Sequence, residues 1–154
     1  MQFNHEYWMA IAINLAKTNN KKEIPVSALI VKDAKLISKA VNQVEEFKDS
    51  TLHAEMIAMR EASKTLENWR LDGCIIYTTL EPCLMCAGAI INSRISKIVF
   101  GAYDAVLGAC GSKLNAFTYL EKKNKPEIIG GIMEEEASKL LKDFFVNVRK
   151  KSLS

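Results

Sequence analysis

The segment Pro82-Cys83-Leu84-Met85-Cys86 constrains this chain more than any other, because it places two cysteines three positions apart directly after an apolar run. The run, residues 74–80, is rich in β-branched and aromatic residues, which favours a central strand. Pro82 suits the first turn of a helix, where its missing N–H costs nothing. Cys83 and Cys86 would then share one face near the positive end of the helix dipole, which favours thiolates. The segment therefore predicts a strand followed by a helix whose start can bind a metal.

A second set of polar groups, His53-Ala54-Glu55, stands at another predicted helix start 30 residues before Cys83. Two neighbouring helices on one face of a sheet can bring their N-termini together, which would place His53, Cys83 and Cys86 at one point. A catalytic zinc site has three protein ligands and an open fourth position, whereas a structural site is closed by a fourth ligand. The sequence therefore predicts a catalytic type of zinc site.

Hydrophobic periodicity predicts one helix, a hairpin, and then alternating helices and strands. The expected helices cover about 8–16, 53–64, 82–92, 114–120 and 134–151, and the expected strands cover 26–31, 36–41, 74–80, 97–100 and 127–129. The last helix carries one apolar stripe, formed by Ala137, Leu140, Leu141, Phe144, Phe145 and Val148. Residues 42–51 are polar and should be irregular, with Ser50 or Thr51 capping the next helix. The pattern predicts a three-layer α/β/α fold with a mixed central sheet of about five strands between helices, formed by a single domain over residues 1–154.

Composition indicates an ordinary globular protein, with 49% hydrophobic and 25% charged residues. The chain shows neither a signal-peptide pattern at its start nor an apolar run near the roughly 18 residues of a membrane span, so we expect a cytoplasmic protein. Its four cysteines should then be thiols or metal ligands. The net charge of +3 is too small to identify a nucleic-acid partner. Basic clusters at 122–125 and 139–154 could bind phosphates, although charge alone favours solvated helix ends.

The residue types at this predicted site fit one chemistry. Zinc on His53, Cys83 and Cys86 would lower the pKa of a bound water from about 15.7 to about 7. Glu55 need not be a ligand, so it can take the proton from that water and pass it on. Zinc-bound hydroxide with a proton shuttle is what hydrolytic deamination of an amino-substituted purine or pyrimidine ring requires.

Each signal also has a plainer interpretation. A lone Cys-x-x-Cys can be half of a structural zinc site or a redox pair, and His53 or Glu55 alone can be an ordinary polar residue at a helix start. Together the two motifs are far more specific. Cys74 should belong to the core, and Cys110 could close the zinc site as a fourth ligand, although a small buried thiol is favoured there.

The His-x-Glu and Pro-Cys-x-x-Cys motifs together resemble the signature of the zinc nucleoside and nucleobase deaminases. Similarity to the bacterial tRNA adenosine deaminases covers nearly the whole chain. It extends over residues 6–9, 24–26, 42, 80–89, 93–95, 100–102, 104, 108–109, 111–112 and 143–145.

The resemblance implies a homodimer that converts the wobble adenosine of a tRNA anticodon to inosine, with one Zn²⁺ per chain. It assigns the metal to His53, Cys83 and Cys86, and proton transfer to Glu55. Asn42 and the backbone of Ala54 would hold the flipped base in a narrow pocket. The partner would be the anticodon stem-loop of tRNA, and the basic C-terminal helix would contact it.

Three positions depart from that family pattern. Ser27 replaces an expected glycine, Val106 stands where a lysine is usual, and Tyr103 stands where some members have arginine. A tyrosine can stack on a base, so RNA binding can be kept by other means. Two alternatives stay open, namely a deaminase of free guanine or a cytosine nucleoside, and a zinc-stapled RNA-binding module whose metal is closed by Cys110.

Overall fold

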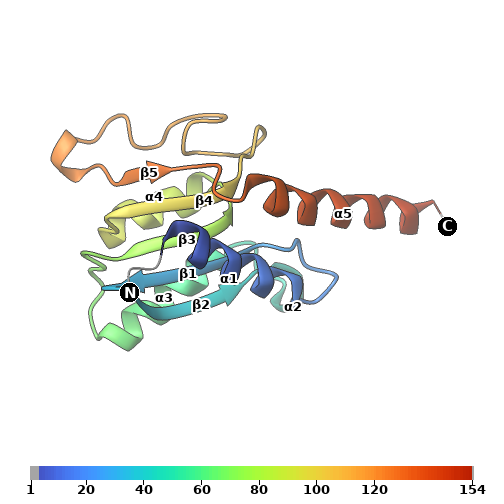
Figure 1. The fold of residues 1–154 in the computed structure, drawn as a ribbon, viewed down its shortest axis with the longest axis horizontal. Coiled ribbons are helices and arrows are strands. Elements are labelled where there is room, and N and C mark those ends of the chain that lie inside the picture. The colour runs from blue at the N-terminus through green and yellow to red at the C-terminus, as the bar shows by residue number, and fades with distance from the viewer. Residues whose placement is uncertain (1–3, 154) are drawn as a thin grey trace.

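A computed structural model describes residues 4–153 (Figure 1). Its helices are α1 (His5–Lys17), α2 (Val44–Phe47), α3 (Ala54–Leu66), α4 (Leu84–Ser93) and α5 (Glu134–Ser152), with a 3₁₀ turn at Lys122–Asn124. Its strands are β1 (Ser27–Lys32), β2 (Lys35–Val41), β3 (Ile75–Leu80), β4 (Lys97–Ala102) and β5 (Glu127–Ile129). No helix in this part of the chain has the length and apolar character needed to span a membrane.

The five strands form one mixed sheet in the order β2-β1-β3-β4-β5. β1 pairs antiparallel with both β2 and β3, whereas β3, β4 and β5 run parallel. The β1–β2 hairpin turns through Asp33 and Ala34, which both have positive φ, as the tightest hairpin turns require. The sheet confirms the predicted mixed architecture of five strands.

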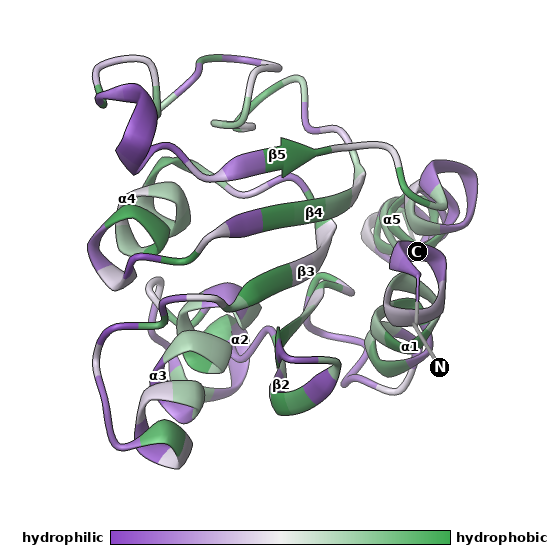
Figure 2. Ribbon diagram, turned by 60° about the vertical axis from the view of Figure 1, so that its left-hand side comes forward, coloured by the Kyte–Doolittle hydropathy of each residue, from purple (hydrophilic) through white to green (hydrophobic). Residues whose placement is uncertain are grey.

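Helices cover both faces of this sheet, which gives the three expected layers (Figures 1 and 2). α3 and α4 lie on one face, and α1 and α5 lie on the other. Alternate residues of β1 separate the two cores: Ala28 and Ile30 pack in the core with α3 and α4, and Leu29 and Val31 pack in the core with α1. Because α3 and α4 share a face, their N-termini can meet at one end of the sheet.

The helix α1 follows its predicted pattern and supports β1 directly. Asn4 caps it, since its Oδ1 accepts a hydrogen bond of 2.8 Å from the backbone N–H of Tyr7. Ser27, at the position where a glycine was expected, is fully buried and donates its hydroxyl proton to the carbonyl of Ala12 in α1. The serine therefore replaces a close backbone approach with a hydrogen bond between helix and strand.

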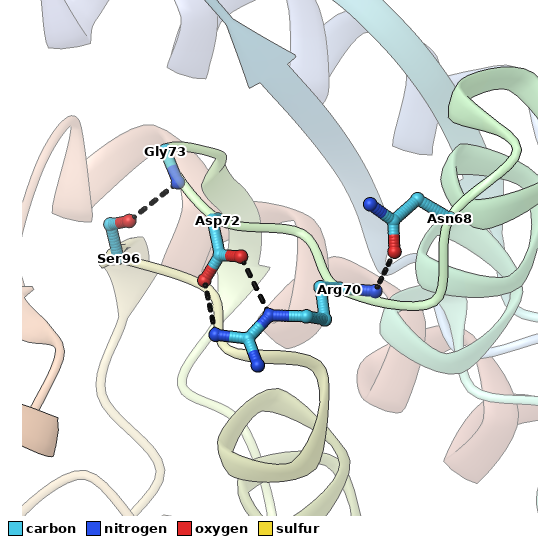
Figure 3. Close-up of polar contacts among 5 residues, drawn as sticks. All are labelled: Asn68, Arg70, Asp72, Gly73 and Ser96. Carbon is cyan, nitrogen blue, oxygen red and sulfur yellow. Dashed lines mark hydrogen bonds and ion pairs between the residues drawn. The ribbon is translucent and has the colours of Figure 1, made fainter.

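An irregular loop connects α3 to β3 and contacts the C-terminal end of α4, where the N–H of Leu71 donates to the carbonyl of Ser93 (Figure 3). Within it, the guanidinium of Arg70 binds the carboxylate of Asp72, and the backbone N–H of Arg70 donates to Asn68. The N–H of Gly73 donates to the hydroxyl of Ser96 at 2.9 Å. These exposed contacts fix the loop but add little stability, as surface ion pairs generally do.

Some local predictions are wrong. Residues 114–120 form turns instead of a helix, because Cys110 and Asn115 pair in an isolated bridge that folds the chain back. Helix α2 lies in the stretch expected to be irregular, where the buried carboxylate of Glu23 accepts hydrogen bonds from the N–H groups of Glu45 and Glu46. A partner twenty residues away stabilises this helix, so local sequence could not reveal it.

The predicted helix starts also shift by one to three residues. The N-cap position of α3 is His53, instead of Ser50 or Thr51, and the N-cap position of α4 is Cys83, so Pro82 lies outside the helix. The shift matters for the site, because a cap residue has extended instead of helical backbone, which changes the direction in which its side chain leaves the chain. His53 and Cys83 both have this extended backbone.

Candidate active site

The caps of α3 and α4 bring the three predicted metal donors together. The Nδ1 of His53 lies 3.5 Å from the Sγ of Cys83 and 3.5 Å from the Sγ of Cys86. All three donor atoms lie within 4.8 Å of one another. Neither cap side chain binds its own helix N-terminus, so both are available to the centre.

This donor set fits zinc in kind and in spacing. In a tetrahedral site, a sulfur at about 2.3 Å and a nitrogen at about 2.1 Å from zinc lie roughly 3.6 Å apart. The two Nδ1–Sγ distances of 3.5 Å match this separation. One imidazole and two thiols leave the fourth position of a tetrahedron to water or substrate, as in catalytic zinc sites.

The protonation of the three donors is strongly coupled. Hydrogen bonds from Cys86, and to a smaller extent from His53, lower the pKa of the Cys83 thiol to about 4. The pKa of His53 is raised, chiefly by its hydrogen bond with Cys83, and that of Cys86 is raised chiefly by its hydrogen bond to Cys83. These hydrogen bonds favour the thiolate of Cys83, the form of cysteine that binds metal.

Neither of the other two cysteines belongs to this group. Cys110 does not bring its sulfur within 4.8 Å of all three donors, and its backbone N–H donates to a carboxylate oxygen of Glu81. Burial raises the pKa of its thiol to about 12, which keeps it protonated. Cys74 is fully buried in the core of α3 and α4, as predicted.

Glu55 lies in the first turn of α3, two residues after His53, and is only 4% exposed. Burial raises the pKa of its carboxyl group. Glu55 lines the same cavity as His53 and Cys83. A buried carboxyl group beside a metal centre, and outside the donor set, can accept and return a proton at that position.

Asn42 ties the start of α3 to the segment that leads into β1. Its Oδ1 accepts a hydrogen bond of 2.8 Å from the backbone N–H of Ala54, and its Nδ2 donates to the carbonyl of Ile24 at 3.2 Å. Asn42 also lines the cavity. The two groups predicted to hold a base are therefore bonded to each other, and the N–H of the fully buried Ala54 is already used by Asn42.

A cavity of about 790 Å³ opens over these residues. Three segments form its walls: residues 22–26 with Val44 and Glu45, residues 103–107, and one face of α5 with Leu141, Phe144, Phe145 and Val148. The apolar stripe predicted for the last helix thus borders the cavity, and Ala137 is its only buried member among the described residues. The cavity has room for a purine base and part of its sugar.

Two acidic residues that sequence reasoning missed border the same cavity. Glu23 and Glu81 are both 2% exposed, and each accepts hydrogen bonds from backbone N–H groups of a neighbouring wall. Glu81 could have been suspected, because it stands between the strand and the first cysteine of the motif. No local signal marked Glu23.

The fold and the donor set define a zinc-binding deaminase, and comparison with known proteins places the chain in this class. Residues 2–102 match the model of the cytidine and deoxycytidylate deaminase zinc-binding region, and the chain belongs to this family. Within it, the tRNA-specific adenosine deaminase of Bacillus subtilis (strain 168) is 42% identical over 147 residues, which cover 95% of this chain and 91% of that protein. The chain belongs with the tRNA-specific adenosine deaminases.

Solved structures agree with this placement. A structure from studies of A-to-I editing by tRNA:A34 deaminases superposes with a TM-score of 0.79 at 33% identity, covering 88% of this chain and 99% of that one. The guanine deaminase of B. subtilis reaches a TM-score of 0.63 at 41% identity, but covers only 66% of each chain. The likeness to the tRNA:A34 deaminase structure therefore covers more of this chain than the likeness to the guanine deaminase does.

Proposed function

We propose that this protein hydrolyses adenosine to inosine at the wobble position of tRNA anticodons. The observation that carries the proposal is the convergence of His53, Cys83, Cys86 and Glu55 on one cavity, in a chain that resembles tRNA-specific adenosine deaminases over 95% of its length. Bound at the three donors, zinc supplies the acidity that makes a water molecule nucleophilic near neutral pH.

Glu55 carries the protons of the reaction. Its carboxylate takes a proton from the attacking water and delivers it to the ring nitrogen next to C6 as the C6–O bond forms. A second proton, which also passes through Glu55, goes to the exocyclic amine as the C6–N bond breaks. Water and adenosine thus become inosine and ammonia, and the carboxylate returns to its starting state.

The base must leave its stack to reach this position. Asn42 lines the cavity, where it can meet the edge of such a base, and the apolar residues of α5 lie along the wall. Beyond the cavity, α5 ends in Arg149, Lys150 and Lys151, which can contact phosphates.

We infer that the enzyme works as a cytoplasmic homodimer. The four cysteines of the described chain are free thiols, which suits a reducing compartment such as the cytoplasm. The proposed tRNA substrate of the enzyme would be met in that compartment. Large exposed hydrophobic residues such as Trp69 and Leu84 offer surface for a second copy. Light scattering after gel filtration tests the dimer, and a mass of 17.2 kDa, that of one chain, would contradict it.

The decisive experiment incubates zinc-loaded protein with an anticodon stem-loop that carries adenosine at the wobble position, and measures inosine. The parent should form inosine, and Glu55→Ala should form none while it keeps one zinc per chain. Glu61→Ala is the matched control, because Glu61 lies on the same helix but is exposed and pairs with Lys64. Equal activity of the parent and Glu55→Ala would contradict the assignment of Glu55.

The same samples separate the two classes of substrate. Partial similarity to a guanine deaminase makes free guanine the alternative that most needs a direct test. Turnover of free guanine or cytidine, without inosine from the stem-loop, would replace the proposed function with the deamination of small molecules.

A further inference from the structure

Glu81 lies between the end of β3 and the metal donor Cys83, and its carboxylate is buried. Its own N–H donates to the carbonyl of Ala102 at 2.8 Å, which continues the pairing of β3 with β4 and fixes its backbone. No ion pair of residues 4–153 includes Glu81. A buried acid without a cation needs other partners, since burying an uncompensated charge is costly.

Those partners come from both ends of a single loop. Oε1 of Glu81 accepts hydrogen bonds from the N–H of Asp104 at 3.1 Å and from the hydroxyl of Ser112. Oε2 accepts from the N–H groups of Cys110 and Ser112 at 3.0 and 3.1 Å. Four donors therefore bind one carboxylate, and hydrogen bonds to a charged acceptor are the stronger kind.

A second layer of contacts extends this arrangement to the cavity. Oδ1 of Asp104 accepts hydrogen bonds from the N–H groups of Val106 and Leu107, at 3.0 and 3.1 Å. Gly108 packs so closely that a Cβ there would lie 2.5 Å from the carboxyl carbon of Glu81 and 2.4 Å from the carbonyl oxygen of Asp104. Residues 103–107 form one wall of the cavity, so their position depends on Glu81.

We infer that Glu81 is a positioning residue for substrate: it holds the loop 103–112 as the wall against which the RNA binds, and it takes no part in proton transfer. The inference rests on the proposed function, since it names what a second acid in this site does. The two buried acids thus have different roles: Glu55 transfers protons, and Glu81 positions the loop that forms one wall of the cavity.

The test replaces Glu81 with glutamine, which has the same shape but places an NH2 donor at one of two oxygen positions that each accept a backbone N–H. For the stem-loop, the KM of Glu81→Gln should rise about 10-fold to 100-fold, in line with the loss of charged hydrogen bonds, while kcat changes less than about 3-fold. Zinc content should stay at one per chain. Hydrogen exchange at the amides of residues 104–112 should become faster, and the central strands should stay protected. Glu121→Gln, an exposed loop acid paired with Lys123, is the matched control and should behave as the parent.

Gly108→Ala reaches the same contact from the loop side. It should raise KM and speed amide exchange in the same way, and the double variant should be no worse than the more affected single variant, because both changes release the same wall. Loss of zinc, or a fall in kcat at unchanged KM, would show that Glu81 acts on Cys83 and would overturn the inference. Unchanged KM and exchange in Glu81→Gln would also overturn it.

Two further measurements decide the remaining cases. If Glu81→Gln does not fold, Ser112→Ala removes one of the four donors and should raise KM about 3-fold to 10-fold, with faster exchange at residues 110–112; no change there contradicts the inference. If the parent makes no inosine, the proposed function fails by itself. Amide exchange in Glu81→Gln still tests whether Glu81 fixes the loop 103–112, and exchange at the parent's rate would contradict that role.

Discussion

The side-chain oxygen of Asn42 accepts a hydrogen bond of 2.8 Å from the backbone N–H of Ala54. This bond joins the end of β2 to the first residue of α3, which lies between the candidate metal donor His53 and Glu55, the proposed proton carrier. The other end of the Asn42 amide donates to the carbonyl of Ile24. Asn42 therefore fixes the start of α3 and also lines the cavity.

Asn42→Ala should weaken both the fold and the reaction. It leaves a buried N–H at Ala54 and a carbonyl at Ile24 without this partner, so the free energy of unfolding should fall by about 1–3 kcal/mol in a urea titration. The kcat/KM for the stem-loop should fall about 100-fold, since small displacements of catalytic groups are costly. Asn68→Ala, which removes a similar amide-to-backbone contact from the remote loop of Figure 3, should leave kcat/KM unchanged. Parent-like kcat/KM in Asn42→Ala would show that the site does not depend on this bond.

The geometry of the metal centre predicts which of the cysteines are required for zinc binding. Cys86→Ser should lose zinc and activity together, because it removes one of only three donors in the described chain. Cys110→Ser and Cys74→Ser should keep one zinc per chain, measured by elemental analysis. Loss of zinc from Cys110→Ser would indicate a closed site with four ligands, which is the arrangement of a structural zinc module.

Substitutions of Ser27 should change the stability of the fold without changing catalysis. Ser27→Ala removes the hydrogen bond to the carbonyl of Ala12, and the free energy of unfolding should fall by about 0.5–1.5 kcal/mol. Ser27→Gly should cost more, because glycine adds backbone entropy to the unfolded strand. The exposed Ser50 provides the control, and Ser50→Ala should unfold at the parent's urea concentration. Equal stability of Ser27→Ala and the parent would show that the bond contributes nothing net.

The elements that carry the site were predictable because they depend on local signals. The strand 75–80, the two cysteines and the His-x-Glu pair follow from composition and spacing, and the fold brings their donors together as expected. The walls of the cavity were not predictable in the same way. Glu23 binds N–H groups more than twenty residues away, and Glu81 binds a loop that begins at residue 103. Such contacts exist only once the chain is folded, so periodicity contains no trace of them.

The last helix shows a further limit of prediction from local sequence. Its apolar stripe was correctly predicted as one face of a helix over 134–152, but a stripe does not say what it packs against. Only Ala137 is buried among its described residues; Leu141 packs against the core and also borders the cavity, and Phe144, Phe145 and Val148 border the cavity. Amphipathic residues at a binding site and in a core have the same spacing, and the structure alone separates them.

Tyr103 lines the cavity, at a position that departs from the family pattern expected from the sequence. Its ring is 51% exposed and rests edge-on against the buried Phe100, with ring centroids 5.1 Å apart at 89°. A ring held in this way can stack on a base at little cost in side-chain entropy, and stacking contributes about 1–3 kcal/mol per base. Tyr103→Ala should therefore weaken stem-loop binding about 5-fold to 100-fold, while kcat at saturating RNA stays near that of the parent.

Two further variants at this position separate stacking from charge. Tyr103→Phe keeps the ring and should bind as the parent does, because its hydroxyl is not required for stacking. Tyr103→Arg should also bind, but with a steeper salt dependence, since one added phosphate contact to a single strand increases the slope of log K against log salt by about 0.7. Tyr119→Ala, at a 75% exposed tyrosine outside the cavity lining, is the control and should not change the affinity. If Tyr103→Ala and Tyr119→Ala bind the stem-loop equally well, the RNA does not pass over Tyr103, and the mouth of the cavity must be approached from the side of residues 22–26.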